Sequence, residues 1–134
     1  LKNLKEAEND HLRIIHKGHI THDEALGLMK GSNVLLLCLP FNTLSAIFVS
    51  GKLLEYIASG TPIAAVVDSE SDAAVLIRDH QAGQIFAQNE AEELSNFIQK
   101  QLAINHTSLS PETISIFERK ETTRQLAQLI EASF

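Results

Sequence analysis

Short apolar runs alternate along the chain with stretches whose apolar residues recur at helical spacing. Two of these runs, residues 33–39 and 62–67, are continuous and of strand length, which is typical of parallel strands covered on both faces. Shorter runs at residues 11–16 and 84–87 predict two further strands. The predicted strands are therefore 11–16, 33–39, 62–67 and 84–87, and predicted helices begin near Thr21, Ser50, Ser71 and Asn89.

Helix boundary signals support this division of the chain. Thr21 is followed three residues later by Glu24, which is the pattern of a capping box. Ser50 can cap the next helix, Gly60 suits a left-handed residue after its last turn, and Pro62 prevents continuation. A third helix is predicted over 71–80 and a fourth from Asn89, with Glu92 three residues on.

The helix between Ser50 and Gly60 carries polar and apolar residues on different faces. Helical spacing places Leu53, Leu54, Ile57 and Ala58 on the side that we expect to be buried. The same spacing places Lys52, Glu55 and Ser59 on the opposite side.

Strands and helices alternate at least three times, which predicts an α/β domain with a parallel sheet and helices on both faces. We interpret residues 1–134 as a single Rossmann-like domain. After a polar break at 105–109, helical patterns resume from Ser110 and end with an apolar stripe at residues 126–130.

Composition narrows the classes of function. The net charge of −6, with no cluster of Lys or Arg, excludes a nucleic-acid-binding surface from our expectations. The single cysteine, Cys38, lies within an apolar run and is predicted to be a buried free thiol. No apolar run is long enough to cross a bilayer.

The start of the Ser50 helix is the strongest candidate for chemistry. A helix N-terminus offers free amides and a partial positive charge to a phosphate. Gly51 allows a ligand to approach the backbone closely, and Lys52 adds a full charge. Glu55, one turn further on, can accept hydrogen bonds from sugar hydroxyls. The alternative is an ordinary surface helix on which Lys52 and Glu55 form a solvated pair.

Two other groups of polar residues are conceivable metal ligands. His16, His19 and His22 are spaced by three, but they fall on a strand end, a loop and a first helical turn. Asp68 and the acidic residues after it are more typical of a solvated turn that caps the next helix. We therefore predict no metal site.

Four segments together resemble the C-terminal half of GT-B glycosyltransferases, especially family 4. They are IIHKGHITHDEALGLMKGSNVLLL, SGKLLEYIASGTPIAAV, GQIF and FERKETTRQLAQLI, and they span nearly the whole chain. The most specific part is the pattern Lys-x-x-Glu-Tyr-x-x-x-Gly-x-Pro, from Lys52 to Pro62.

The resemblance implies a Rossmann-like domain that binds a nucleoside-diphosphate sugar, in an enzyme that retains anomeric configuration without a metal or other cofactor. Ser50, Gly51, Lys52 and Leu53 would hold the diphosphate, and Glu55 would hold the ribose. Lys17, Gly18 and His19 would lie near the base. The implied product is a glycan or polysaccharide.

The resemblance also implies that the acceptor-binding N-terminal domain belongs to the same polypeptide, so that this chain is a donor-side fragment, inactive alone. A cytoplasmic location is implied, compatible with peripheral association of the full enzyme at the inner face of the membrane. Residues 118–134 would then dock partly against the other half. No catalytic residue is assigned within the fragment.

The sequence also departs from the family pattern. Many members carry a second Glu where this chain has Ile47, so an acidic contact to the donor sugar is missing. A non-catalytic nucleotide-binding or regulatory α/β module is the alternative. A receiver domain fits poorly because Lys17-Gly18, and no acidic pair, follow the first predicted strand. An NAD-binding domain also fits poorly, since no Gly-x-Gly-x-x-Gly is present.

Overall fold

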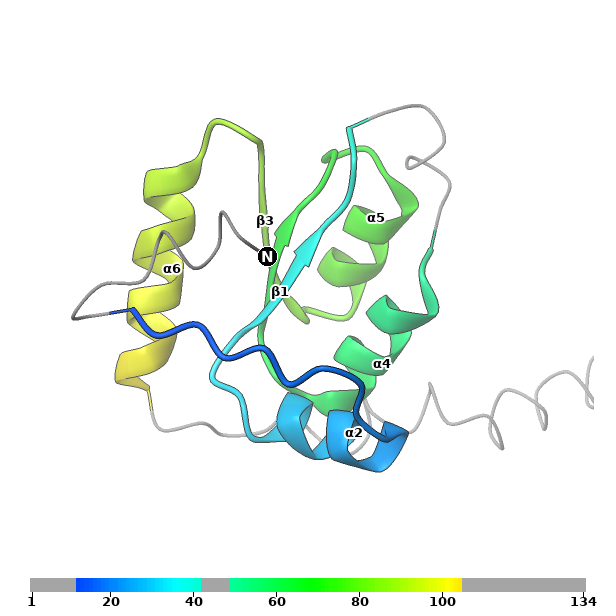
Figure 1. The fold of residues 1–134 in the computed structure, drawn as a ribbon. Helices are drawn as coiled ribbons and strands as arrows, with labels where there is room; N and C mark the ends of the chain where they lie inside the picture. The colour runs from blue at the N-terminus through cyan, green and yellow to red at the C-terminus, as the bar shows by residue number, and fades with distance from the viewer. Residues whose placement is uncertain (1–11, 42–48, 105–134) are drawn as a thin grey trace, which may run out of the picture.

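The computed structural model describes residues 12–41 and 49–104, which form an α/β domain (Figure 1). Three parallel strands form one sheet in the order β1-β2-β3. In chain order the elements are α2 (His22–Lys30), β1 (Leu35–Cys38), α4 (Gly51–Ser59), β2 (Ile63–Val66), α5 (Asp72–Asp79), β3 (Gly83–Phe86) and α6 (Ala91–Ala103). The predicted class, a parallel sheet with helices on both faces, is confirmed.

The two continuous apolar runs form β1 and the central strand, β2. Leu35 of β1 pairs with Ile63 of β2, and Ile63 in turn pairs with Gly83 of β3. β2 has the most completely buried side chains of the sheet, with Ile63, Ala64 and Ala65 all inaccessible to solvent. A strand with neighbours on both sides and helices on both faces is apolar throughout, which explains the unbroken run.

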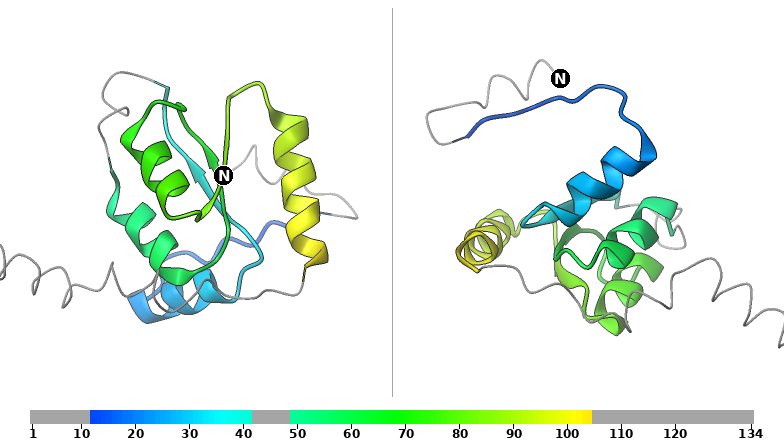
Figure 2. Two further views of the ribbon diagram at one scale, coloured as in Figure 1. Left: turned by 180° about the vertical axis from the view of Figure 1, so that it is seen from behind. Right: turned by 90° about the horizontal axis from the view of Figure 1, so that it is seen from below.

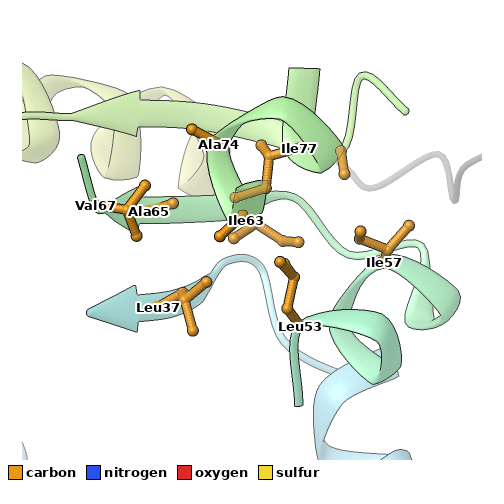
Figure 3. Packing of buried hydrophobic residues seen from close by; sticks show 10 residues of the cluster. Leu37, Leu53, Ile57, Ile63, Ala65, Val67, Ala74 and Ile77 are labelled. Carbon is orange, nitrogen blue, oxygen red and sulfur yellow. The ribbon is translucent and has the colours of Figure 1, made fainter. Parts of the chain in front are cut away.

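One face of the sheet is covered by α4 and α5, which lie side by side in Figures 1 and 2. Leu53 and Ile57 of α4 and Ile77 of α5 pack onto this face with no solvent exposure. Figure 3 shows how these side chains meet those of the strands. The cluster comprises Leu37, Leu53, Ile57, Ile63, Ala65, Val67, Ala73, Ala74, Ile77 and Ala82. Burying each large aliphatic side chain is worth about 1.5–3 kcal/mol.

Among the described residues, α6 packs on the other face of the sheet, over β2 and β3. Phe86 of β3 meets Phe97 of α6 with ring centroids 5.7 Å apart and planes inclined by 60°. β1 lies beyond the reach of this helix, so Leu36 is 53% exposed. Cys38, two residues along the same face, is also exposed. The prediction that Cys38 is buried was wrong, because a continuous apolar run does not reveal which face lacks a cover.

The predicted helix boundaries are confirmed at three of four starts. Thr21 and Glu24 form the expected capping box at α2. This box lowers the pKa of the Glu24 carboxyl, because the backbone amide and hydroxyl of Thr21 both donate to it. Ser71 caps α5 by accepting from the Ala74 amide. Gly60 ends α4 with a left-handed φ of 75°.

The fourth start differs from the prediction. The N-cap of α6 is Glu90, not Asn89, and its side chain makes no capping bond within the helix. The Glu90 carboxylate instead accepts a 2.8 Å hydrogen bond from the amide of Ala87, just after β3. The Glu90 carboxylate thus bonds to a residue that precedes the helix and makes no capping bond within it. Residue spacing alone does not distinguish these two arrangements.

The predicted strand at 11–16 is wrong for the residues that the structure describes. Leu12 makes one isolated bridge, and residues 13–17 have no regular secondary structure. Ile15 is 63% exposed, and α2, which follows, has no buried residue. An extended apolar segment becomes a strand only when another strand pairs with it, and none of the described strands does. The expectations for residues 105–134, including the final helical stripe, lie outside the described residues.

Gly83 is required by the close approach of β3 to β2. A Cβ added there would lie 1.9 Å from the backbone oxygen of Ile63, which belongs to the rigid central strand. We predict that Gly83→Ala lowers the free energy of unfolding by at least about 1–3 kcal/mol, the usual cost of overpacking. Urea denaturation followed by circular dichroism measures it.

Gly27 provides the matched control, because it lies in the middle of α2 and a Cβ there meets nothing within 4 Å. Gly27→Ala should stabilise the protein, by about 0.5–1 kcal/mol, through helix propensity. Equal effects of the two substitutions would contradict the close approach of β3 to β2.

Candidate functional site

α4 starts where the sequence predicts. The Ser50 hydroxyl accepts a 3.2 Å hydrogen bond from the Leu53 amide, and the Ser50 carbonyl accepts from the same amide at 3.0 Å. Of the four residues predicted to hold a diphosphate, Leu53 therefore has its amide already engaged, and its side chain is fully buried. The amides of Gly51 and Lys52 remain as the donors of the first turn.

The surroundings of these two amides are open. Gly51 and Lys52 are exposed, and a Cβ at Gly51 would meet nothing within 4 Å. The first turn of α4 contains no acidic residue, whereas α2, α5 and α6 each have at least one. The positive end of the α4 dipole and the Lys52 ammonium are therefore not neutralised within their own helix turn, which favours an anion.

Glu55 lies one turn further into α4 and is partly buried. Neither Glu55 nor Lys52 bonds to any residue in the described part of the chain, and they form no ion pair with each other. Lys52 and Glu55 thus make no direct ion pair, and an ordinary surface helix stays the alternative interpretation. A partly buried carboxylate without a donor is able to accept hydrogen bonds from a ligand.

Two residues of α4 face differently from the prediction. Leu54, assigned to the buried stripe, is 37% exposed, while Ser59, assigned to the polar face, is 8% exposed. The Ser59 hydroxyl donates to the carbonyl of Tyr56 and accepts from the amide of Thr61. A serine satisfied by nearby backbone groups can be buried at little cost, and a hydropathy pattern does not reveal this.

The residues predicted to lie near the base do not share a hollow with residues of α4. Lys17, Gly18 and His19 are exposed, and Gly18 has a left-handed φ of 70°. Lys17 lines a hollow of about 270 Å³ whose other walls are Ile20 and residues of α2. No residue of α4 lines this hollow. The base-proximal role of these three residues therefore stays a prediction.

Tyr56 belongs to the same region, although it was not predicted to be a site residue. Burial raises the pKa of its phenol above the usual 10.0, and negative charge on Cys38 and Glu55 raises it further. The sequence contains a signal for this placement, because Tyr56 follows Glu55 directly and lies four residues after Lys52, and residues four apart share a helix face.

A second hollow, of about 630 Å³, includes residues that follow all three strands. Its lining contains Phe41 after β1, Val67 and Asp68 after β2, and Ala87 after β3. In parallel sheets, ligands gather at the carboxyl ends of strands. The lining also includes Arg78 and residues 83–85 of β3, so the hollow extends along this strand, and no residue of α4 lines it.

The acidic turn and the histidines do not form metal sites in the described residues. No group of three or more His, Cys, Asp or Glu side chains converges there. The Asp68 carboxylate accepts from the Glu70 amide, and Ser71 caps α5, as expected of a turn that precedes a helix. No described helix has the length and apolar character needed to cross a membrane.

Comparison of the chain with known protein families, with curated proteins and with solved structures gave no match. The function of this domain must therefore be inferred from its fold and from the geometry at the start of α4.

The chain contains one tyrosine and no tryptophan, so its tyrosinate absorbance reports Tyr56 alone. We predict that Glu55→Gln lowers the pKa of Tyr56, because a negative neighbour that opposes ionisation is removed. A spectrophotometric pH titration measures this pKa. Glu93→Gln on α6 is the control and should leave it unchanged; the same pKa in wild type and Glu55→Gln would place Glu55 away from the phenol.

Proposed function

We propose that this domain binds a nucleoside-diphosphate sugar and forms the donor-side half of a retaining, metal-independent glycosyltransferase of the GT-B type. The observation that carries the proposal is the arrangement on α4. Two amides and a lysine stand at the helix start and a carboxylate lies one turn away, all without a partner among the described residues. A phosphate site beside an acceptor for a diol matches the two polar parts of a nucleoside diphosphate.

The parallel sheet supports this proposal at the level of fold. Binding at helix starts that follow parallel strands is a general property of open α/β sheets, in which the first helical turn receives the phosphate. The narrower part of the proposal, a glycosyltransferase of the GT-B type, is supported by the sequence, because the pattern from Lys52 to Pro62 resembles family 4.

The arrangement would act on the leaving group. As the bond between sugar and diphosphate breaks, negative charge accumulates on the phosphate oxygens. The Gly51 and Lys52 amides and the Lys52 ammonium would stabilise that charge. Removing one such preorganised donor typically costs about 2.7–4 kcal/mol in barrier. The acceptor site and any group that acts on the acceptor hydroxyl would come from an N-terminal domain of the same polypeptide.

We predict that this chain alone binds a nucleoside diphosphate weakly and transfers no sugar. Titration calorimetry with UDP, GDP and ADP measures the affinity, and release of the free nucleoside diphosphate from the corresponding sugar nucleotides measures transfer. A folded sample that binds none of the three nucleotides would contradict the site assignment.

We further predict that Glu55→Gln and Lys52→Ala weaken binding in different ways. The ionised Glu55 would accept charge-assisted bonds from ribose hydroxyls, worth about 1.5–3 kcal/mol each at most. Glu55→Gln should therefore reduce affinity for ribonucleotides and much less for their 2′,3′-dideoxy forms. Lys52→Ala should reduce the affinity for nucleoside diphosphates more than the affinity for monophosphates, and this loss of affinity should be smaller at high salt.

The controls for these two variants are Glu93→Gln and Lys100→Ala, both exposed residues of α6 that should leave binding unchanged. An equal loss for ribo and dideoxy nucleotides in Glu55→Gln would show that Glu55 does not hold the ribose.

A further inference from the structure

A third hollow, of about 320 Å³, lies at the end of the sheet where β2 and β3 begin. Pro62 and Ala82, the residues that precede these two strands, line it together with Phe97 and Gln101 of α6. In Figures 1 and 2, α6 runs alongside β3 and its last turn lies at this same end of the sheet. Gly60, which follows the last turn of α4, is also part of the lining. The nine residues of α4 therefore separate this hollow from the start of that helix by about 14 Å.

Three glutamine side chains line this hollow and come from three separate parts of the chain. Gln81 follows α5, Gln84 belongs to β3 and Gln101 belongs to α6. None of their carboxamides makes a hydrogen bond in the described part of the chain. No charged residue is found among the described residues that line the hollow. Because each carboxamide has two N–H donors and an acceptor oxygen, the hollow offers neutral donors and acceptors side by side.

Gln81 has a backbone conformation that glutamine rarely adopts. Its φ of 49° is in the left-handed region, and no other residue except glycine has a positive φ in the described ranges. The amides of Gln81 and Ala82 donate to the carbonyls of Arg78 and Ile77, so two hydrogen bonds fix this conformation at the end of α5. Glycine is the usual residue at such a helix end, because a side chain there is strained. The glutamine therefore costs stability, and a strained residue beside a hollow points to a role for its side chain.

Phe97 forms an aromatic wall of the hollow and is held in place. Its ring packs against Phe86 with centroids 5.7 Å apart, and Phe97 is only partly buried. A neighbouring hollow of about 350 Å³ shares three lining residues with the first and adds Glu93, Asn96 and Lys100 of α6. The two hollows together form one groove along α6, and the only two charged residues of its described lining have opposite signs.

We propose that this groove binds a neutral oligosaccharide. The carboxamides of Gln81, Gln84 and Gln101 bond to its hydroxyl groups, and the Phe97 ring packs against its C–H groups. A hydroxyl group donates and accepts at once, and one planar carboxamide supplies both partners. The C–H groups of a sugar carry a slight positive charge, which favours the negative face of an aromatic ring.

The lining is less suited to other classes of ligand. The two charges of the groove cancel and the whole chain has a net charge of −6, so an anionic ligand is repelled. A peptide binds through strand pairing or by placing apolar side chains into pockets, whereas Phe97 is the only large apolar residue in the described lining. The saccharide site does not depend on the proposed nucleotide site, because the two lie at opposite ends of α4.

Titration of the isotopically labelled chain with maltotriose, cellotriose and triacetylchitotriose tests the proposal. We expect at least one of these saccharides to shift the side-chain amide signals of Gln81, Gln84 and Gln101 in NMR spectra. Gln84→Ala and Gln101→Ala should each lower the affinity about two- to tenfold, as expected for one lost hydrogen bond. Gln99→Ala is the matched control, because Gln99 is exposed on α6 and does not line the groove, and it should leave the affinity unchanged.

Gln81→Gly distinguishes a binding role from a structural one. This variant should unfold at a higher urea concentration, because the strain is removed, yet bind the saccharide about two- to tenfold more weakly. A variant that is more stable and binds with unchanged affinity would overturn the proposal. An absence of shifts with all three saccharides, or equal shifts with glycerol or triglycine at the same concentration, would overturn it as well.

Discussion

The structure depends on the packing of α4 and α5 onto one face of the parallel sheet. Leu53 and Ile57 have no solvent exposure, and they meet Ile63 of the central strand. Because Leu53 lies in the first turn of α4, the contact that anchors the helix also fixes its start. The backbone amides of Gly51 and Lys52 are positioned by the buried Leu53, which directly follows them in the sequence. Gly51 and Lys52 themselves are exposed to solvent.

The opposite end of α4 is fixed by hydrogen bonds. The Thr61 hydroxyl donates to the carbonyl of Met29 at the end of α2, over 32 positions of sequence, and Ser59 links Tyr56 to Thr61. With Gly60 left-handed between them, the chain turns directly from α4 into β2. The helix is thus held at both ends, and a ligand at its start would meet a preorganised surface.

Local signals in the sequence were sufficient for most of the elements. The capping box at Thr21, the caps at Ser50 and Ser71 and the stop at Gly60 each involve neighbouring residues, so their chemistry can be seen in the sequence. The continuous runs that form β1 and β2 identified the parallel sheet.

Most of the errors have a different physical origin, since they depend on contacts between distant segments. Residues 12–16 have strand-like composition, but none of the described strands pairs with them, and Cys38 is exposed. The error at α6 is local: the Glu90 carboxylate accepts from the amide of Ala87 and makes no capping bond within the helix, and residue spacing does not distinguish these two possibilities. For the site, the start of α4 lies where the sequence predicted it, whereas the role of Lys17, Gly18 and His19 near the base stays a prediction.

The central claim is that the amides of Gly51 and Lys52 at the start of α4 receive a diphosphate. Titrating the isotopically labelled protein with a nucleoside diphosphate, and following backbone amide shifts by NMR, tests it most directly. α5 is an internal reference, because it also begins at a serine cap but has Asp72 in its first turn. We predict that the Gly51 and Lys52 amides shift most and that those of Asp72 and Ala73 do not move. Shifts of equal size at both helix starts, or none at α4, would contradict the claim.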